Sequence, residues 1–187
     1  DDYPYLLTRH WPAPYRARRI RELLDAAPRH VAAGMTAIQM DEMSGIISVF
    51  RPLLTNIPIS VEEERRAVEM IRQWDGTMDR DRPEPLLFVA WLTELQRLVF
   101  ADELGAAYPD WRGLHPRALA EALRGRGAWC DDTTTESWRE SCRERTALAL
   151  QRALDRLGRR YGDDPAGWRW GAAHRALFDH GLFRFVP

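Results

Sequence analysis

The sequence predicts an all-α fold, an irregular multi-helix bundle in a single domain. Three observations lead to this prediction. Apolar residues recur at intervals of three and four over several long segments, which is the spacing of a buried helix face. No segment alternates convincingly between apolar and polar residues as a strand does, and no period repeats along the 187 residues. We expect residues 1–14 to form an extended arm and residues 15–187 to form the helical bundle.

The composition argues against several classes of function. The 27 basic residues are all arginines, and they are interspersed with 28 acidic residues, so no basic surface for nucleic acid is expected. No apolar run reaches about 18 residues, so no membrane-spanning helix is expected, and no signal peptide is visible. The chain begins Asp1-Asp2 without a methionine, and we expect it to be processed or to be a piece of a longer protein.

The first helix is expected from about Tyr15, because prolines interrupt the arm before it, to about Ala27, where Pro28 ends it. One apolar stripe of this helix contains Ile20, Leu23, Leu24 and Ala27. Arg16 falls on the same stripe, four residues before Ile20. A buried guanidinium cannot lose its charge, so it must find acceptors within the fold or at a site. Arg16 is therefore the first candidate site residue.

A second helix is expected from about Met35 to Leu54, where apolar residues recur at helical spacing. Gln39 falls on the apolar stripe of this helix, whereas Asp41 points away from it. A buried amide needs hydrogen-bond partners, so Gln39 is a candidate partner within the helix packing. The alternative is that Gln39 bonds a nearby backbone group and nothing more.

The third helix is expected to begin with a capping box at Ser60-Val61-Glu62-Glu63 and to end near Trp74. Three acids, at positions 75, 79 and 81, lie in the turn that follows. Their spacing does not fit a calcium-binding EF-hand loop, and no bidentate glutamate follows at the required distance. We interpret them as solvated turn acids that cap helices, and no metal site is predicted.

The fourth helix, from about Pro85 to Leu104, is apolar on nearly all its faces, and Gly105 ends it. A helix of this kind lies at the centre of a bundle or is covered by a partner. A short helix is expected at about 116–123, followed by a loop.

Ser137 and Glu140 predict another capping box, which would open a long helix that runs to about Arg160 and is closed by Gly162. A last helix is expected over about 170–179.

Cys130 and Cys142 are the only cysteines. In a cytosolic protein two such residues would most often be buried thiols. Here Cys130 lies in the predicted loop and Cys142 early in the long helix, so a short disulfide is geometrically feasible. Closing a loop of this size would stabilise the fold by roughly 3 kcal/mol.

The last predicted helix places Trp170, His174 and Phe178 on one face, so His174 is expected to be packed and hydrogen-bonded between aromatic rings. A zinc site would need a second close ligand at metal spacing, and none is present. The sequence contains no G-x-S-x-G motif and no glycine-rich phosphate loop. By itself the chain is expected to carry no catalytic apparatus and no cofactor.

Four stretches of the sequence together resemble one family. They are Tyr3–Leu24 (YPYLLTRHWPAPYRARRIRELL), Ile38–Ser44 (IQMDEMS), Trp74–Asp81 (WDGTMDRD) and Trp168–His180 (WRWGAAHRALFDH). In this order they resemble the penicillin amidase family of N-terminal-nucleophile (Ntn) hydrolases, which includes penicillin, cephalosporin and acyl-homoserine-lactone acylases. The four stretches are spread over nearly the whole chain, from Tyr3 to His180.

The resemblance implies that the chain is the helical portion of an Ntn-hydrolase β-chain and lacks the αββα sandwich. In this family the nucleophile is the first residue of the β-chain, its own α-amine acts as the base through water, and an asparagine side chain contributes to the oxyanion hole. The resemblance places both residues before Asp1, so the fragment alone is expected to be inactive. Its expected partners are the remainder of the same precursor and a small-molecule amide, with no nucleic acid and no membrane.

The resemblance also assigns roles to residues. Arg16 matches, with a small gap in the alignment, an arginine that supports the oxyanion asparagine; the alternative is that Arg16 bridges acceptors inside the fold. The family takes one calcium ligand from the arm, but this arm has no acid at the matching position, and Asp2 comes too early. Members of the family are typically exported, so a periplasmic or secreted location is expected, which favours the Cys130–Cys142 disulfide.

A second hypothesis needs no chemistry. Eight tryptophans and a helix that is apolar on all faces would also suit a helical interaction module that binds a partner protein.

Overall fold

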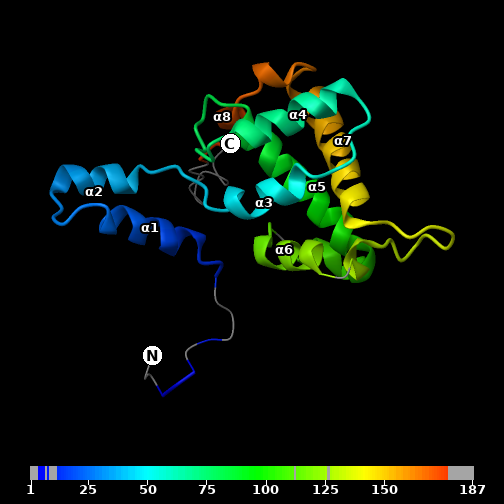
Figure 1. Cartoon of the computed structure of the whole chain (residues 1–187), viewed down its shortest axis with the longest axis horizontal. Coiled ribbons are helices and arrows are strands. Elements are labelled where there is room, and N and C mark those ends of the chain that lie inside the picture. Colours follow the sequence, from blue (N-terminus) through cyan, green and yellow to red (C-terminus); the bar gives the residue numbers. More distant parts are fainter. Residues whose placement is uncertain (1–3, 7, 9–11, 112, 126, 177–187) are drawn as a thin grey trace, which may run out of the picture.

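The computed structural model describes residues 4–6, 8, 12–111, 113–125 and 127–176, and this part of the chain is all-α (Figure 1). Its α-helices are α1 (Tyr15–Asp25), α2 (Ala32–Gln39), α3 (Ile47–Leu54), α4 (Glu62–Gln73), α5 (Glu84–Leu104), α6 (Pro116–Arg124), α7 (Cys142–Tyr161) and α8 (Trp170–Ala173). Three short 3-10 turns lie at Gly105–Asp110, Ala128–Cys130 and Pro165–Gly167. The all-α prediction is confirmed.

Helix α5 forms the centre of the bundle, as its all-round apolar sequence predicts. Thirteen of its 21 residues are buried, and α7 packs along its length. The indole of Trp91 is fully buried and its Nε1 donates a 2.8 Å hydrogen bond to the carbonyl of Thr146 on α7. Helices α3, α4 and α6 surround this pair (Figure 1), so that one continuous core connects α3 to α8.

The predicted second helix over 35–54 is wrong, because the structure divides it into α2 and α3. Residues 40–46 between them turn away from helical geometry, and part of this segment pairs with residues 76–78. The backbone N–H of Ser44 donates to the carbonyl of Gly76 over 2.9 Å, and the N–H of Met78 donates to the carbonyl of Glu42 over 2.9 Å. These long-range bonds replace the helical bonds that the local pattern predicted.

Neither predicted capping box forms at its predicted residues: α4 has Val61 as its N-cap and no side-chain cap, and the box of α7 is displaced along the chain. Helix α4 begins at Glu62 rather than one residue earlier, and its third residue, Glu64, accepts a 2.8 Å bond from the backbone N–H of Ser60. Helix α7 begins after a reciprocal capping box of Ser141 and Glu144, four residues later than expected. The loop before α7 holds residue 140 outside the helix, because both its backbone and its side chain bond to residues 131 and 132.

The loop before α7 is closed at its base by a disulfide between Cys130 and Cys142, whose Cα atoms are 4.9 Å apart. Arg145, which is buried on α7, donates from Nε to the carbonyl of Cys130 and forms a 2.7 Å ion pair with Asp132. Hydrogen bonds from Thr134 and the pairing with Arg145 lower the pKa of Asp132 to about 2. The loop therefore depends on a charged carboxylate at Asp132.

Acid should weaken this loop through Asp132. Because its folded-state pKa is depressed, the stabilisation is present above the ordinary pKa of about 4 and is lost as the pH falls towards 2. We expect Asp132→Asn to remove about 1–2 kcal/mol at pH 7 and to flatten the dependence of stability on pH between about 4 and 2. Urea unfolding at a series of pH values measures both quantities. A variant with the same acid dependence as the parent would contradict this assignment.

The last helix is shorter than predicted, since α8 ends at Ala173. The backbone N–H groups of Trp170 and Gly171 donate to the carbonyls of Arg82 and Arg80, which anchors the start of α8 to another segment. His174 follows the helix, is exposed and stacks on Trp170 with a centroid distance of 4.6 Å. His174 was expected to be packed and hydrogen-bonded between aromatic rings on a helix. The structure confirms the contact with Trp170 but leaves His174 exposed beyond the helix end, and the predicted contact with Phe178 lies outside the described residues.

Candidate functional site

Backbone hydrogen bonds join three of the four sequence stretches that carry the family resemblance. The bridge between Met43 and Thr77 joins the 38–44 stretch to the 74–81 stretch. The carbonyls of Arg80 and Arg82 accept hydrogen bonds of 2.7 and 3.0 Å from the start of α8, which belongs to the stretch that begins at Trp168. These backbone hydrogen bonds therefore hold together segments that are more than 30 residues apart in the sequence.

Gly76 makes the first of these junctions possible. Its φ of +102° lies in a region that residues with side chains rarely adopt, and its carbonyl accepts the bond from Ser44. A Cβ atom at this position would lie 2.6 Å from Cγ2 of Ile47 and 3.1 Å from Sδ of Met43. Only glycine fits both the turn and the close approach of the two segments.

Arg19 connects α1 to the same junction. Its Nε and Nη2 donate to the two carboxylate oxygens of Asp41 at 3.0 and 2.6 Å, and Asp41 also accepts from the backbone N–H of Met43. The hydrogen bonds from Arg19 lower the pKa of Asp41, and those to Asp41 raise the pKa of Arg19. A planar guanidinium that meets a carboxylate through two bonds fixes an orientation as well as a contact.

The role of Arg19 was not predicted from the sequence. The available signal was Asp41, an acid placed on the polar side of a predicted helix, together with an arginine next to the apolar stripe of the preceding one. Neither residue type identifies the other across 22 positions. The two residues pair because the chain leaves helical geometry after α2, which places Asp41 beside α1.

A groove of about 730 Å³ lies between α1, the end of α2 and the 41–46 segment. It is lined by Tyr15, Arg16, Arg19, Ile20, Leu23, Ile38, Gln39, Asp41, Glu42, Met43, Ser44, Gly45, Ile46 and Met78. The groove therefore brings together Arg16 and Gln39, two of the predicted site residues. The other predicted site residues, which are Trp170, His174 and the two cysteines, do not line it.

Arg16 and Gln39 are both exposed, so the prediction that they are buried is wrong. The reason is that neither α1 nor α2 buries any residue within the described chain, although each has an apolar stripe. No hydrogen bond or ion pair joins the Arg16 guanidinium to another described residue. Its apolar neighbour Ile20 is likewise 41% exposed.

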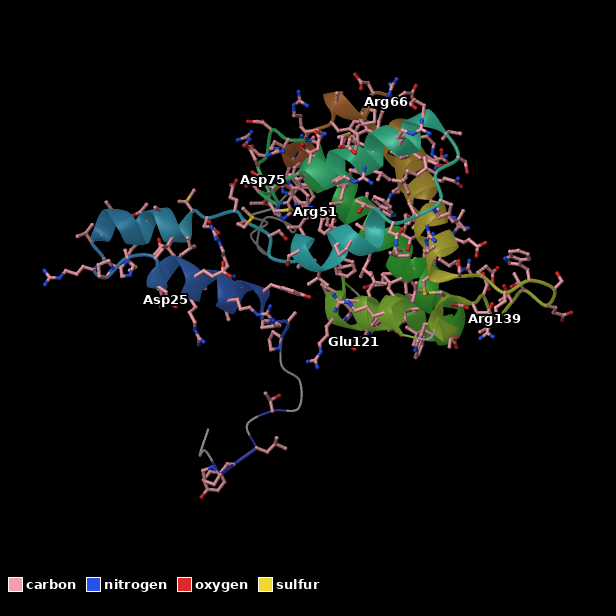
Figure 2. The ribbon with its side chains drawn as sticks, viewed as in Figure 1. Asp25, Arg51, Arg66, Asp75, Glu121 and Arg139 are labelled. Carbon is pink, nitrogen blue, oxygen red and sulfur yellow. A yellow bond between two sulfur atoms is a disulfide. The ribbon has the colours of Figure 1, made fainter. Side chains whose placement is uncertain are left out.

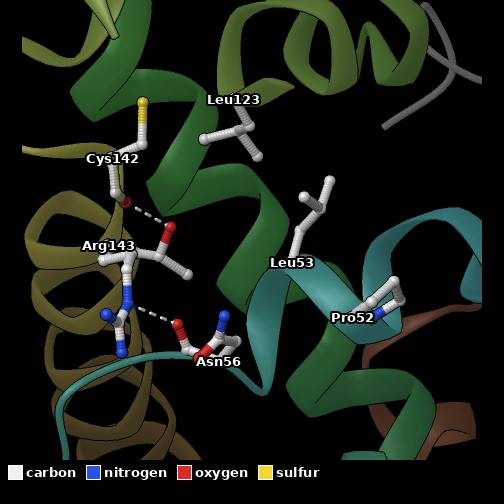
Figure 3. Close-up of a pocket in the computed structure, with 7 residues that line it drawn as sticks. Pro52, Leu53, Asn56, Leu123, Cys142 and Arg143 are labelled. Atoms are coloured by element: carbon white, nitrogen blue, oxygen red, sulfur yellow. Dashed lines mark hydrogen bonds between the residues drawn. The ribbon is translucent and has the colours of Figure 1, made fainter. Parts of the chain in front are cut away.

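A second, smaller pocket of about 100 Å³ lies near the disulfide, between α3, α6 and the start of α7 (Figure 3). Its polar groups bond to their own walls: Arg143 donates to the carbonyl of Asn56, and the Thr146 hydroxyl donates to the carbonyl of Cys142. Leu53 and Leu123 close the other side. The pocket offers no nucleophile or base to a substrate.

The described residues contain no group of three or more His, Cys, Asp or Glu side chains that could hold a metal ion. None of the helices in the described ranges has the length and apolar character needed to cross a membrane. Within the same ranges, the groove gathers two guanidiniums, two carboxylates and an amide beside apolar side chains, and it contains no activated nucleophile.

A family model described as penicillin amidase matches residues 1–187. The chain is 26% identical to the acyl-homoserine lactone acylase QuiP of Pseudomonas aeruginosa over 99% of its own length and 24% of that protein. It is 29% identical to the penicillin acylase 2 proenzyme of Pseudomonas sp. strain SE83, again over 24% of the relative. The chain thus spans about a quarter of the length of these curated relatives.

Among solved structures, the fold is similar to a thermostable penicillin G acylase from Alcaligenes faecalis. The superposition has a TM-score of 0.59 at 19% sequence identity, and it covers 89% of this chain and 35% of that one.

Proposed function

The chain belongs to the penicillin amidase family, and from that premise we propose that it is the helical part of the β-chain of an acylase that hydrolyses linear amides. The observation that carries this proposal is the family match over all 187 residues. The curated relatives are acylases of acyl-homoserine lactones and of penicillin, so the proposed substrates release an acyl group from an amine of one of these two kinds.

The proposed reaction uses groups that lie outside this chain. A serine, threonine or cysteine at the start of the β-chain would attack the amide carbonyl, with its α-amine accepting the proton through water. The C–N bond would then break as the leaving amine takes up that proton, and a water molecule would hydrolyse the acyl-enzyme to release the acid and the free nucleophile. Backbone donors and an asparagine side chain would stabilise the oxyanion. This chain would supply neither, and we propose that the fragment is inactive alone. The remainder of the same precursor is the proposed partner, in line with a relative that is described as a proenzyme.

For Arg16 we propose a supporting role at the substrate cleft. Its guanidinium lines the groove and has no acceptor among the described residues, so an acceptor in the rest of the protein would complete it. Arg19, one turn further along α1, already forms hydrogen bonds with Asp41 and would act by positioning the helix. The two arginines therefore differ in what their removal should do.

We expect Arg16→Ala in the complete enzyme to lower turnover by about tenfold or more while changing stability by less than about 0.5 kcal/mol. Arg18→Ala, on the opposite face of the same helix, is the matched control and should change neither. Steady-state kinetics and urea unfolding measure the two effects. Unchanged turnover in Arg16→Ala would defeat the proposed role and leave Arg16 as a surface residue.

We propose a periplasmic or secreted location, because the Cys130–Cys142 disulfide is stable in an oxidising compartment. We propose no cofactor for this chain. A calcium ion elsewhere in the complete enzyme is compatible with that proposal.

The test of the proposed function is an assay of the complete protein with phenylacetyl, glutaryl and long-chain acyl amides, together with the N-terminal sequence of its mature chains. The expected result is amide hydrolysis by a protein whose β-chain begins with serine, threonine or cysteine. A protein that stays uncleaved and hydrolyses none of these amides would refute the proposal and favour a helical interaction module that shares only the fold.

A further inference from the structure

A pocket of about 570 Å³ lies between the end of α5, helix α6 and the 3-10 turn at Ala128–Cys130. Three aromatic side chains line it, namely Phe100, Trp111 and Trp129. The ring of Phe100 lies 4.9 Å from that of Trp111 and 5.5 Å from that of Trp129, at interplanar angles of 76° and 58°. Because the ring planes are inclined to one another and not stacked, they face the pocket from different directions. The volume is that of a small-molecule site.

The ring of Trp111 is fixed in place by its neighbours. The imidazole of His115 stacks on it with a centroid distance of 4.0 Å and an angle of 4°. The backbone of His115 is held in turn by the buried amide of Gln96, whose Oε1 accepts from the N–H of His115 at 2.6 Å and whose Nε2 donates to the carbonyl of Gly113 at 2.8 Å. A ligand would therefore pay little entropy to order this wall.

The backbone of Trp129 is also held firmly, although its side chain is not covered. The next residue, Cys130, forms the disulfide with Cys142, and its carbonyl accepts a 3.0 Å hydrogen bond from Nε of Arg145. The indole of Trp129 nevertheless remains 48% exposed, whereas Phe100 below it is 6% exposed. The pocket thus has a buried aromatic floor and an aromatic wall that reaches solvent.

Helix α6 places one carboxylate at this pocket. Ala118 and Ala122, one turn apart, leave space on the pocket side of the helix, and Glu121 beside them lines the pocket and is exposed. Figure 2 shows Glu121 at the lower edge of α6, on the outside of the bundle. Its carboxylate forms no ion pair or side-chain hydrogen bond with another described residue, whereas Glu84 and Glu94 are each paired with an arginine. An unpaired negative charge therefore borders the aromatic rings.

We propose that this pocket binds a small organic cation of the quaternary ammonium class. The faces of aromatic rings carry negative electrostatic potential and attract cations, and Glu121 adds a full negative charge. The inference is independent of the proposed acylase activity, because the pocket shares no lining residue with the groove that contains Arg16.

The lining also selects among cations. Glu121 is the only charged side chain in it, and the two tryptophans offer N–H donors but no acceptor. A primary ammonium would leave N–H groups without acceptors in such a pocket, whereas an alkylated ammonium has an apolar surface and no such groups. A phosphocholine headgroup of a lipid is disfavoured, because its phosphate would lie near the carboxylate of Glu121. The proposed ligand is therefore a free molecule.

Calorimetric titration of the complete protein with choline tests this proposal, with two matched analogues as controls. The alcohol 3,3-dimethyl-1-butanol has the shape of choline without its charge, and ethanolamine has the charge without the methyl groups. We expect choline to bind at least about fivefold more tightly than either analogue. Equal binding of choline and the alcohol would overturn the proposal, since the pocket would then recognise apolar surface alone. Absence of saturable choline binding would overturn it as well.

Two substitutions locate the site. Trp129→Leu keeps an apolar wall but removes the aromatic face, so it should weaken choline binding by about fivefold and binding of the alcohol by less than about twofold. Glu121→Gln removes the charge at nearly constant shape and should weaken choline binding by about threefold. Trp138→Ala, which changes an exposed tryptophan outside the pocket, is the control and should have no effect.

Choline binding that survives both Trp129→Leu and Glu121→Gln would overturn the proposal, because the site would then lie elsewhere. Glu121→Gln alters an exposed side chain, so it provides the test even if Trp129→Leu does not fold. Phosphocholine should bind more weakly than choline, and tighter binding of phosphocholine would contradict the role given to Glu121. None of these measurements uses an acyl substrate, so a protein that hydrolyses no amide but binds choline in this way would support this inference alone.

Discussion

Gly76→Ala is expected to destabilise the protein by about 3 kcal/mol, measured as a loss in the free energy of unfolding by urea. Two costs add at this position. The backbone φ of +102° is unfavourable for any residue with a side chain, and the new methyl group would lie 2.6 Å from Cγ2 of the buried Ile47. The junction between the 40–46 segment and residues 76–78 would have to open to relieve the contact.

A matched control separates these two costs. Gly113 also has a positive φ, of +83°, but a Cβ atom there would meet nothing within 4 Å. Gly113→Ala should therefore cost only the backbone term, about 1 kcal/mol. Combining Gly76→Ala with Ile47→Ala removes the contacting methyl group, so the pair should destabilise by less than the sum of the single changes. Additive effects would show that the steric contact is not the cause.

Trp91→Ala is expected to cost about 4 kcal/mol, a larger loss of stability than that of Gly76→Ala. The indole has no exposed surface, and it fills the space between α5 and α7, the most extensive helix contact among the described residues. Its Nε1 also donates to the carbonyl of Thr146. The loss of packing and of this bond should act together, because both lie on the same helix interface.

Trp138→Ala is the matched control, since this tryptophan is 64% exposed and should change stability by no more than about 0.5 kcal/mol. Trp91→Phe keeps most of the packing but not the indole donor, and it should fall between the two. Urea unfolding followed by circular dichroism measures all three variants. A small effect of Trp91→Ala would mean that α5 and α7 are held by other contacts.

Much of the fold was predictable because it depends on local signals. The apolar run from 85 to 104 becomes the buried helix α5, and Gly105 and Gly162 end α5 and α7 with positive φ angles. Pro116 begins α6 at its predicted position, and α1 begins at Tyr15 after the last proline of the arm. In each case the residue that decides the boundary acts on its own backbone.

The displaced boundaries had a different cause. A second Ser and Glu pair, at 141 and 144, competes with the predicted pair at 137 and 140, and the bonds of Glu140 to Asp131 and Asp132 decide between them. Residues 40–46 have a helical pattern but leave the helix, because their backbone finds partners at 76–78. No sequence window of helical length contains those partners.

The candidate site was likewise predictable from the sequence only in part. The sequence singled out Arg16 and Gln39 because they interrupt apolar stripes, and the structure places both on one groove. Their predicted burial was wrong because periodicity identifies the apolar face of a helix without identifying what covers it. The bidentate contact between Arg19 and Asp41 joins two residues 22 positions apart, and neither has a local signal for the other.

The sequence by itself therefore determined the helical class of this protein, the helices whose limits are set by proline and glycine, and the helix that forms the centre of the core. These features follow from the backbone preferences and side-chain periodicity of neighbouring residues. Only the tertiary structure decided where the backbone leaves the helix after Gln39, which arginine of α1 is paired, and which apolar face stays uncovered. Those outcomes depend on contacts between distant segments, whose free energies outweigh the local preference for continuing a helix.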